Sequence, residues 1–320
     1  MTLLKALLVG INSYPIKPLR GCVNEVLQIK NLLENRFGFS EANIRVLLNE
    51  DANLEAIQAS LAWLAQEEVE APNHTSRGSG SKKTEARDEA SLRVFHFSGH
   101  GTYVVDLNGD EPDGRDECLV PFDFSTAGML TDDALKELYD RFPRSGNLTL
   151  VMDCCHAGSV DKEAGRDVVT RFLPISLEEQ ESIDAAAHQF GQNQRQFIVE
   201  EISRLRDSGL SDNELNGEIS RLVDQFQKQR FGDLRLRDGN VLLAACRPDQ
   251  QAADALLSGD YHGAFTYCLV RTAEQARGTL PYNDLLQGTA HKMNTLGFTQ
   301  IPQLECAVGH VQQPAFQPFL

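Results

Sequence analysis

Short apolar runs rich in Val, Leu, Ile and Phe recur along the chain. Runs of this length and composition are typical of strands buried on both faces of a parallel sheet. They are LKALLVGIN (4–12), NIRVLLN (43–49), LRVFHFSGH (92–100), NLTLVMDCC (147–155) and NVLLAAC (240–246).

The stretches between and after these runs are amphipathic, with apolar residues at three- and four-residue intervals, which predicts helices. They are EVLQIKNLLENRFG (25–38), ANLEAIQASLAWLAQEE (52–68), DDALKELYDRF (132–142), YHGAFTYCLVRTAEQA (261–276) and YNDLLQGTAHKMNTLG (282–297). PQLEC (302–306) is a candidate edge strand. The alternation predicts one α/β domain: a doubly wound, mostly parallel sheet of about six strands with helices on both faces.

Two segments interrupt this alternation. Residues 71–90 are rich in Gly, Ser and charged side chains, which is typical of a flexible loop that proteases can reach. Residues 160–238 are polar and helix-rich, and we expect an insertion that covers one side of the sheet. The domain therefore divides into parts 1–160, 161–237 and 238–320.

The charge balance narrows the choice of partners. The 320 residues carry 30 Lys and Arg against 46 Asp and Glu, a formal net charge of -16. This sign disfavours nucleic acid and anionic membranes and favours cationic groups such as basic peptides or metal ions. No apolar run reaches the roughly 18 residues of a membrane helix, and the seven cysteines lack disulfide-framework spacing. We expect a cytoplasmic protein with reduced thiols.

Candidate chemistry lies where the third and fourth parallel strands end. Ligands of open α/β sheets bind at these carboxyl ends, here FSGHG and DCCHAG. His100 lies between two glycines, and 55 residues later Cys155 ends the next strand, which suits a Cys-His pair on neighbouring strands. Because strand side chains alternate between faces, Cys154 is expected on the opposite side as a small core residue.

The same residues have other interpretations. His100 and Cys155 could be unrelated residues at strand ends, although the paired glycine-flanked motifs disfavour this. A zinc site is disfavoured because two adjacent cysteines cannot readily both bind one tetrahedral ion. The sequence also has no second Cys/His pair at zinc-finger spacing. Nucleotide binding lacks a Gly-rich phosphate motif after a strand.

The motifs together resemble the metacaspases and orthocaspases, within the caspase-like cysteine peptidases. The resemblance also rests on GINSYP, LRGCVNE (19–25), DGRDECLVPFDF (113–124), CRPDQQAADA (246–255) and HGAFTYCL (262–269). It covers a large-subunit part, about 1–160, and a small-subunit part, about 238–310, but neither the helical region nor the 71–90 loop. It implies a caspase-like fold.

The resemblance implies a cysteine endopeptidase that forms a thioester acyl-enzyme. Cys155 would be the nucleophile and His100 the general base and later acid. The backbone N–H groups of Cys155 and Gly101 would be the oxyanion donors. The alternative from another class is a catalytically weak caspase-like scaffold that signals by binding partners.

In metacaspases the pocket for the residue before the cleaved bond, called S1, holds Arg or Lys against carboxylates. The corresponding positions here are Asp153, Glu25, Cys22 and Ser98, with a weaker candidate in Asp254. Glu25 replaces the Asp usual in the family motif. The preference of the pocket for Arg or for Lys is therefore open. Alternatives are a loop-orienting role for Asp153 and a first-turn helix acid for Glu25.

Many metacaspases require calcium, although the Cys-His chemistry itself needs no cofactor. The matching acids are Asp116, Asp132 and Asp133, and clustered carboxylates suit this ion. A fourth family Asp has no sure match, and a solvated loop with a helix cap at Asp132 explains the same residues equally well.

Relatives often process themselves after basic residues, and loops of this chain supply candidates. These are Arg77, Lys82, Lys83, Arg87, Arg166 and Arg171. Exposed basic residues in loops are usually only solubilising, so each single site is a weak prediction. Since metacaspases are typically monomeric, the resemblance favours a monomer that acts on peptides and proteins with a basic residue before the cleaved bond.

Overall fold

The computed structural model describes residues 2–66, 91–106, 115–142, 146–155, 168–174, 199–206, 239–247 and 250–318, with isolated positions between 176 and 218. The predicted 71–90 loop and most of the predicted 161–237 insertion lie outside these residues. Within the described part, no helix is long and apolar enough to cross a membrane.

A six-stranded sheet forms the centre of the molecule, in the order β12-β9-β7-β3-β1-β2. All neighbours pair in parallel except β12, which runs antiparallel to β9 at one edge. This confirms the predicted mostly parallel sheet. The strands are β1 (Leu3–Gly10), β2 (Ile44–Leu48), β3 (Ser91–Ser98), β7 (Gly146–Asp153), β9 (Val241–Ala244) and β12 (Gln303–Cys306).

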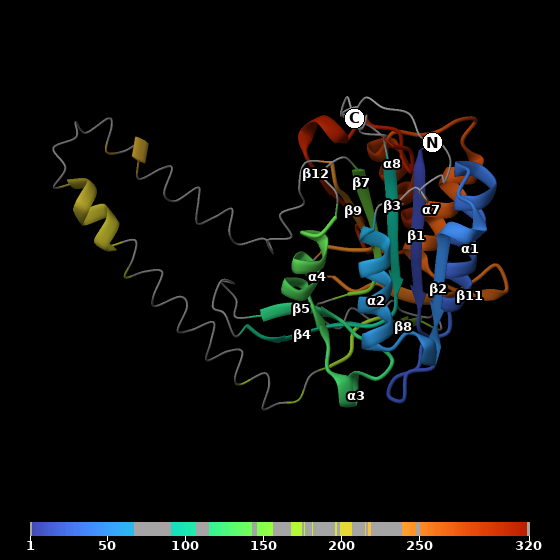
Figure 1. Ribbon diagram of the computed structural model, residues 1–320, viewed down its shortest axis with the longest axis horizontal. Coiled ribbons are helices and arrows are strands. Elements are labelled where there is room, and N and C mark those ends of the chain that lie inside the picture. Colours follow the sequence, from blue (N-terminus) through green and yellow to red (C-terminus); the bar gives the residue numbers. More distant parts are fainter. Residues whose placement is uncertain are drawn as a thin grey trace, which may run out of the picture.

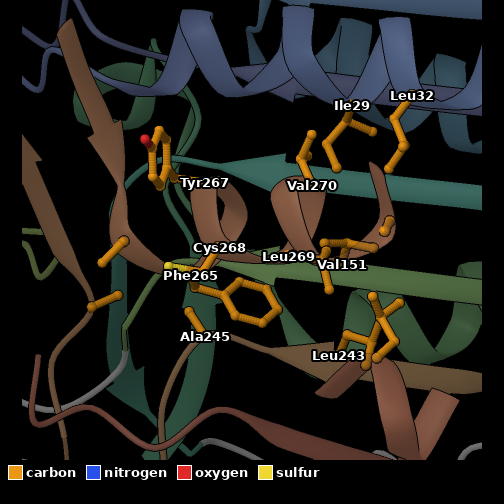
Figure 2. Packing of buried hydrophobic residues seen from close by; sticks show 14 of the residues in the cluster. Ile29, Leu32, Val151, Leu243, Ala245, Phe265, Tyr267, Cys268, Leu269 and Val270 are labelled. Carbon is orange, nitrogen blue, oxygen red and sulfur yellow. The ribbon is translucent and has the colours of Figure 1, made fainter. Parts of the chain in front are cut away.

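Helices cover both faces of this sheet (Figure 1). One buried cluster lies between the sheet and α1 (Cys22–Phe37), α7 (Ala264–Gln275) and α8 (Tyr282–Thr295). The other lies beneath α2 (Leu54–Ala65) and α4 (Asp132–Tyr139). Figure 2 shows the first cluster, in which Phe265 of α7 lies beside Ala245, near Val151 of β7 and Leu243 of β9. Burial of one such aromatic side chain stabilises the fold by roughly 1.5–3 kcal/mol.

Two small antiparallel sheets, which the sequence analysis did not predict, flank the carboxyl ends of the central strands. One contains β4 (Gly101–Val105), β5 (Arg115–Leu119) and β6 (Leu130–Thr131), with α3 (Phe124–Ala127) in the connection between β5 and β6. The other contains β8 (Val168–Thr170), β10 (Ala253–Leu257) and β11 (Asp260–Gly263).

These sheets correct two predictions. Residues 261–276 are not a single helix, because β11 occupies Asp260–Gly263 and α7 begins at Ala264. The predicted 160–238 insertion is also wrong for its early part, since β8 pairs with β10 and returns the chain to the sheet's carboxyl end. Both errors arise because three- to five-residue strands are specified by tertiary pairing more than by local pattern.

Candidate active site

The register between β3 and β7 places His100 and Cys155 at the carboxyl ends of these two neighbouring strands. Ser98 and Asp153 are direct neighbours at the ends of these strands. Each candidate residue follows two positions later. The His100 N–H donates to the Tyr14 hydroxyl (3.1 Å), which in turn donates to the carbonyl of Val120 (2.7 Å).

The His100 imidazole is held by a backbone carbonyl. Its Nε2 lies 2.7 Å from the Lys17 oxygen, so Nε2 carries the proton in this contact and Nδ1 is left as an acceptor. The Tyr14 ring lies 4.7 Å from the imidazole, centroid to centroid. Burial lowers the pKa of His100 to about 4, so the ring is neutral near pH 7.

The two cysteines face opposite sides of the sheet, as strand alternation predicts. Cys155 belongs to the buried cluster under α1 and α7, and Cys154 to the cluster under α2 and α4. Burial raises the pKa of the Cys155 thiol to about 12, and the backbone N–H groups of Ala252 and Arg171 oppose this effect. Cys155 is therefore a neutral thiol beside a neutral histidine.

A short segment, residues 168–174, runs across this pair of residues. Its first part, β8, pairs antiparallel with β10, and the Arg171 N–H continues the pairing by donating to the Ala252 carbonyl (3.2 Å). The Arg171 carbonyl then accepts a hydrogen bond from the Gly101 N–H (2.9 Å). The segment thus crosses the strand ends in an extended form, with Arg171 at the centre.

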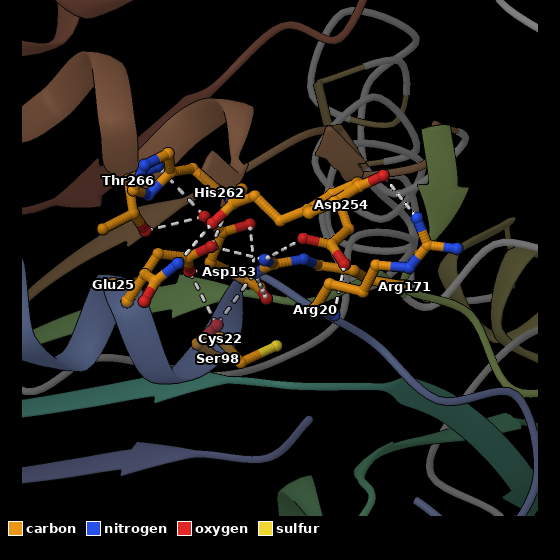
Figure 3. Close-up of polar contacts among 12 residues, drawn as sticks. Arg20, Cys22, Glu25, Ser98, Asp153, Arg171, Asp254, His262 and Thr266 are labelled. Atoms are coloured by element: carbon orange, nitrogen blue, oxygen red, sulfur yellow. Dashed lines mark hydrogen bonds and ion pairs between the residues drawn. The ribbon is translucent and has the colours of Figure 1, made fainter. Parts of the chain in front are cut away.

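The Arg171 side chain occupies a buried acidic pocket (Figure 3). We define this pocket by Glu25, Ser98, Asp153 and Asp254, and it encloses an arginine of 0% exposure. Arg171 was expected among exposed loop residues, and that part of the prediction is wrong. Burying a guanidinium is costly unless opposite charges and hydrogen bonds surround it, and this pocket supplies both.

Both terminal nitrogens of Arg171 are bound by this pocket. Nη1 donates to Glu25 Oε2 (3.0 Å), Ser98 Oγ (2.9 Å) and the Asp153 carbonyl (2.9 Å). It also lies 3.1 Å from Asp153 Oδ1 as an ion pair. Nη2 contacts Glu25 Oε1 and lies 3.5 Å from Asp254 Oδ1. Planar, two-point recognition of this kind suits a guanidinium group.

Backbone and side-chain donors fix the three carboxylates in place. Thr266 donates to Asp153 Oδ2 from its N–H (3.0 Å) and its hydroxyl (2.6 Å). The Arg20 N–H donates to Asp254 Oδ2 (2.7 Å), and the Gly263 N–H donates to Glu25 Oε1. The carboxylates come from α1, β7 and β10, and their donors come from the residues just before α1, the end of β11 and the first turn of α7.

Gly263 must be a glycine for the pocket to exist. A Cβ atom at this position would lie 2.5 Å from Asp153 Oδ2, 2.5 Å from Glu25 Oε1 and 2.8 Å from Arg171 Cζ. These distances are well inside van der Waals contact, so any side chain here would displace the carboxylates or the guanidinium.

Asp153 has an altered proton affinity. Burial raises the pKa of its carboxyl to about 6, and the Arg171 guanidinium limits that rise. At pH 7 most of the population is ionised, and the charge pairs with the guanidinium. The pocket should therefore hold a cation less well in mildly acidic solution.

The remaining predicted residues fall into three groups. Cys22 is buried beside Ser98, and its role in binding a substrate side chain stays a prediction. Asp116, Asp132 and Asp133 lie on β5 and at the start of α4. The other basic candidates lie outside the described residues: Arg77, Lys82, Lys83, Arg87 and Arg166.

The predicted calcium site is not formed by the residues that the structure describes. Among those residues, no group of three or more His, Cys, Asp or Glu side chains could hold a metal ion. Residues 107–114, which adjoin Asp116 in the sequence, lie outside the described part. Calcium binding stays a prediction.

Sequence reasoning missed several residues that support the site. Tyr14 and Lys17 hold His100, and Thr266 orients Asp153. Tyr14 belongs to the quoted GINSYP motif, so a signal for it was present. Nothing local to Lys17 or Thr266 marks them, because each acts on a residue more than 80 positions away.

The chain is similar in sequence to proteins of one known family. A family model described as "Caspase domain" matches residues 4–310. Metacaspase-9 of Arabidopsis thaliana is 28% identical over 326 residues, which cover 94% of this chain and 93% of that protein. Metacaspase-1 of Meyerozyma guilliermondii is 31% identical over 283 residues, 84% of this chain and 61% of that protein.

Two solved structures share the fold at low sequence identity. Protein GSU0716 from Geobacter sulfurreducens has a TM-score of 0.59 and 20% identity, and the match covers 99% of this chain and 100% of that chain. Caspase-1 from Spodoptera frugiperda has a TM-score of 0.52 and 11% identity, with 95% of this chain and 86% of that chain covered. At these identities, the likeness supports the fold alone.

The fold and the family match define a caspase-like α/β protein. The chain belongs to the caspase domain family and has metacaspases among its relatives. It is accordingly a cysteine-type peptidase, whose substrates are proteins.

Proposed function

We propose that this peptidase cleaves after arginine, with Cys155 as nucleophile and His100 as general base, and that its own Arg171–Phe172 bond is a substrate. The observation that carries the proposal is the placement of Arg171. Its guanidinium lies in the acidic pocket, while its carbonyl accepts from the Gly101 N–H close to His100 and Cys155. A substrate residue before a cleaved bond needs this combination of contacts.

The pocket favours arginine over lysine. Glu25 binds both terminal nitrogens of the guanidinium, one with each carboxylate oxygen, and Asp254 is reached only from Nη2. A lysine ammonium is a single point charge and could not contact both sets of acceptors together. We therefore expect lysine substrates to be cleaved more slowly.

The proposed reaction needs only side chains and backbone groups of this chain and one water molecule. The Cys155 sulfur attacks the Arg171 carbonyl carbon while His100 Nδ1 takes the thiol proton. The Gly101 N–H stabilises the resulting oxyanion, and the Cys155 N–H is predicted to donate beside it. The bond to the Phe172 nitrogen then breaks, and His100 returns the proton to that nitrogen. Water hydrolyses the thioester, which yields a carboxylate on Arg171 and restores the thiol.

The charge states of the pair favour proton transfer during attack. Burial places the pKa of Cys155 at about 12 and that of His100 at about 4, so both are neutral at pH 7. A preformed thiolate-imidazolium pair would need the opposite order of these values. We infer that His100 acts as a general base in the attack step.

The test is hydrolysis of fluorogenic peptides with Arg, Lys or Asp before the cleaved bond. Wild type, Cys155→Ala and Cys154→Ala are compared, each with calcium and with chelator. The proposal expects cleavage after Arg that survives Cys154→Ala and is lost in Cys155→Ala. Cleavage after Asp, or activity that remains in Cys155→Ala, would overturn it. The chelator arm tests the predicted calcium requirement.

A further inference from the structure

The segment continues beyond Arg171, and its next two residues are also buried. Phe172 and Leu173 are each 6% exposed, although they lie in a short segment between stretches outside the described residues. Phe172 joins the buried cluster on one face of the sheet and Leu173 the cluster on the other. Both side chains thus enter separate apolar surroundings.

The backbone of these residues is hydrogen-bonded to β4. The Leu173 N–H donates to the Gly101 carbonyl (3.0 Å), and the Thr102 hydroxyl donates to the Leu173 carbonyl (2.8 Å). Phe172 forms a parallel bridge with Gly101. Main-chain contacts of this type add a peptide to a sheet edge whatever its sequence, and pockets for the side chains then supply selectivity.

The Lys17 side chain binds the segment at the residues on either side of Arg171. Its ammonium donates to the Phe172 carbonyl (2.9 Å) and to the Thr170 hydroxyl (3.3 Å). Residues before and after Arg171 are therefore tied to the same side chain. Since the Lys17 carbonyl also contacts His100, the peptide backbone after Arg171 has a fixed position relative to the imidazole.

The Phe172 ring has a specific aromatic neighbour. Its centroid lies 5.6 Å from that of Tyr103 on β4, with the rings inclined at 33°. The Arg115 guanidinium lies 4.4 Å from the centroid of the same tyrosine. Phe172 and, from β5, Arg115 are therefore both neighbours of the Tyr103 ring, which is 7% exposed. Aromatic pairs at this separation are favourable beyond the area that they bury.

We propose that β4 is a binding site for the substrate residues that follow the cleaved bond, with Tyr103 selecting a large apolar or aromatic residue directly after the arginine. This rests on the proposed cleavage after arginine and extends it to the other side of the bond. The substrate class becomes an extended segment with Arg followed by Phe or a similar residue. Selection on both sides narrows the proteins that the enzyme can cut.

The test compares two internally quenched peptides, VVTRFLPIS and VVTRALPIS, which differ only after the arginine. Wild type should show kcat/KM at least about fivefold higher for the Phe peptide. Tyr103→Ala should bring this ratio close to one, while Tyr103→Phe, which keeps the ring, should retain it. Thr102→Val removes the hydroxyl that donates to the carbonyl of the second residue after the arginine, and it should lower both kcat/KM values by a similar factor.

The ratio of the two kcat/KM values does not depend on how much of a variant is folded, because a partly unfolded variant loses activity on both peptides equally. Competition from the internal 168–174 segment also affects both peptides alike. Equal cleavage of the two peptides by wild type would overturn the proposed site and leave cleavage after arginine intact. A preference for Phe that survives Tyr103→Ala would overturn the role of Tyr103. Cleavage of neither peptide would instead overturn the proposed function.

Discussion

The amide nitrogen of Gly101 lies 2.9 Å from the carbonyl oxygen of Arg171, across the ends of two strands that are remote in sequence. This single contact relates the candidate oxyanion donor to the residue whose side chain fills the acidic pocket. It positions one peptide bond, Arg171–Phe172, beside His100 and Cys155. An extended segment bound in this way also competes with other peptides for the same site.

Release of this segment should expose the candidate nucleophile. Arg171→Ala removes the buried cation and leaves its carboxylate partners without it, a change that typically costs 3–5 kcal/mol and should displace the segment. Alkylation of Cys155 by iodoacetamide should become at least about tenfold faster than in wild type. Peptide mapping by mass spectrometry measures this rate, with half-buried Cys306 as an internal reference.

An unchanged rate at Cys155 in Arg171→Ala would mean that the segment does not protect the thiol. Faster alkylation of Cys306 as well would indicate general loosening of the fold, and the comparison would then be repeated with Arg171→Lys.

Activity should depend on the protonation of Asp153. Burial raises the pKa of this carboxyl to about 6, and the guanidinium in the pocket lowers it, so an empty pocket should titrate at or above that value. As the pH falls through this range, the carboxylate becomes neutral and loses its attraction for the substrate arginine. We expect kcat/KM for an Arg peptide to fall about tenfold per pH unit below the pKa.

Asp153→Asn is the matched variant for this dependence. It should have a lower kcat/KM at pH 7 and show no decline between pH 7 and 5, because the group that titrates is gone. The pKa of His100, at about 4, lies below this window and should not obscure it. A decline that persists in Asp153→Asn would assign the titration to another group.

The pocket should not tolerate a methyl group at Gly263. Gly263→Ala would place a Cβ 2.5 Å from both Asp153 and Glu25, and the shift needed to relieve this should cost about a hundredfold in kcat/KM for Arg peptides. Gly278→Ala is the matched control, because nothing lies within 4 Å of a Cβ at that glycine. Thermal unfolding of both variants distinguishes a blocked pocket from an unfolded chain. Equal activities of the two would contradict the pocket geometry.

Much of the framework could be predicted from the sequence, for identifiable reasons. Continuous apolar runs predicted β1, β3 and β7. The helical stretches between the runs predicted that these strands are parallel. The strand period alone placed Cys154 and Cys155 on opposite faces. Positions of the acidic pocket came from the family resemblance, and the structure brings Glu25, Asp153 and Asp254 together around one guanidinium.

The occupant of the pocket could not be chosen in advance. Arg171 was one of six basic candidates, and no local pattern distinguishes an arginine that pairs with residues 18, 83 and 146 positions away. The run VVTRFL does contain β-branched and aromatic residues typical of a strand. That signal would have placed residues 168–173 in an extended segment, although not its pairing with β10 and β4.

Sequencing of the fragments from the purified chain tests the central claim most directly. The account predicts that wild type divides into two pieces, that the second begins at Phe172, and that Cys155→Ala remains intact under the same conditions. A second fragment that begins elsewhere while the Arg171–Phe172 bond stays whole, or a cut at this bond that persists in Cys155→Ala, would contradict it.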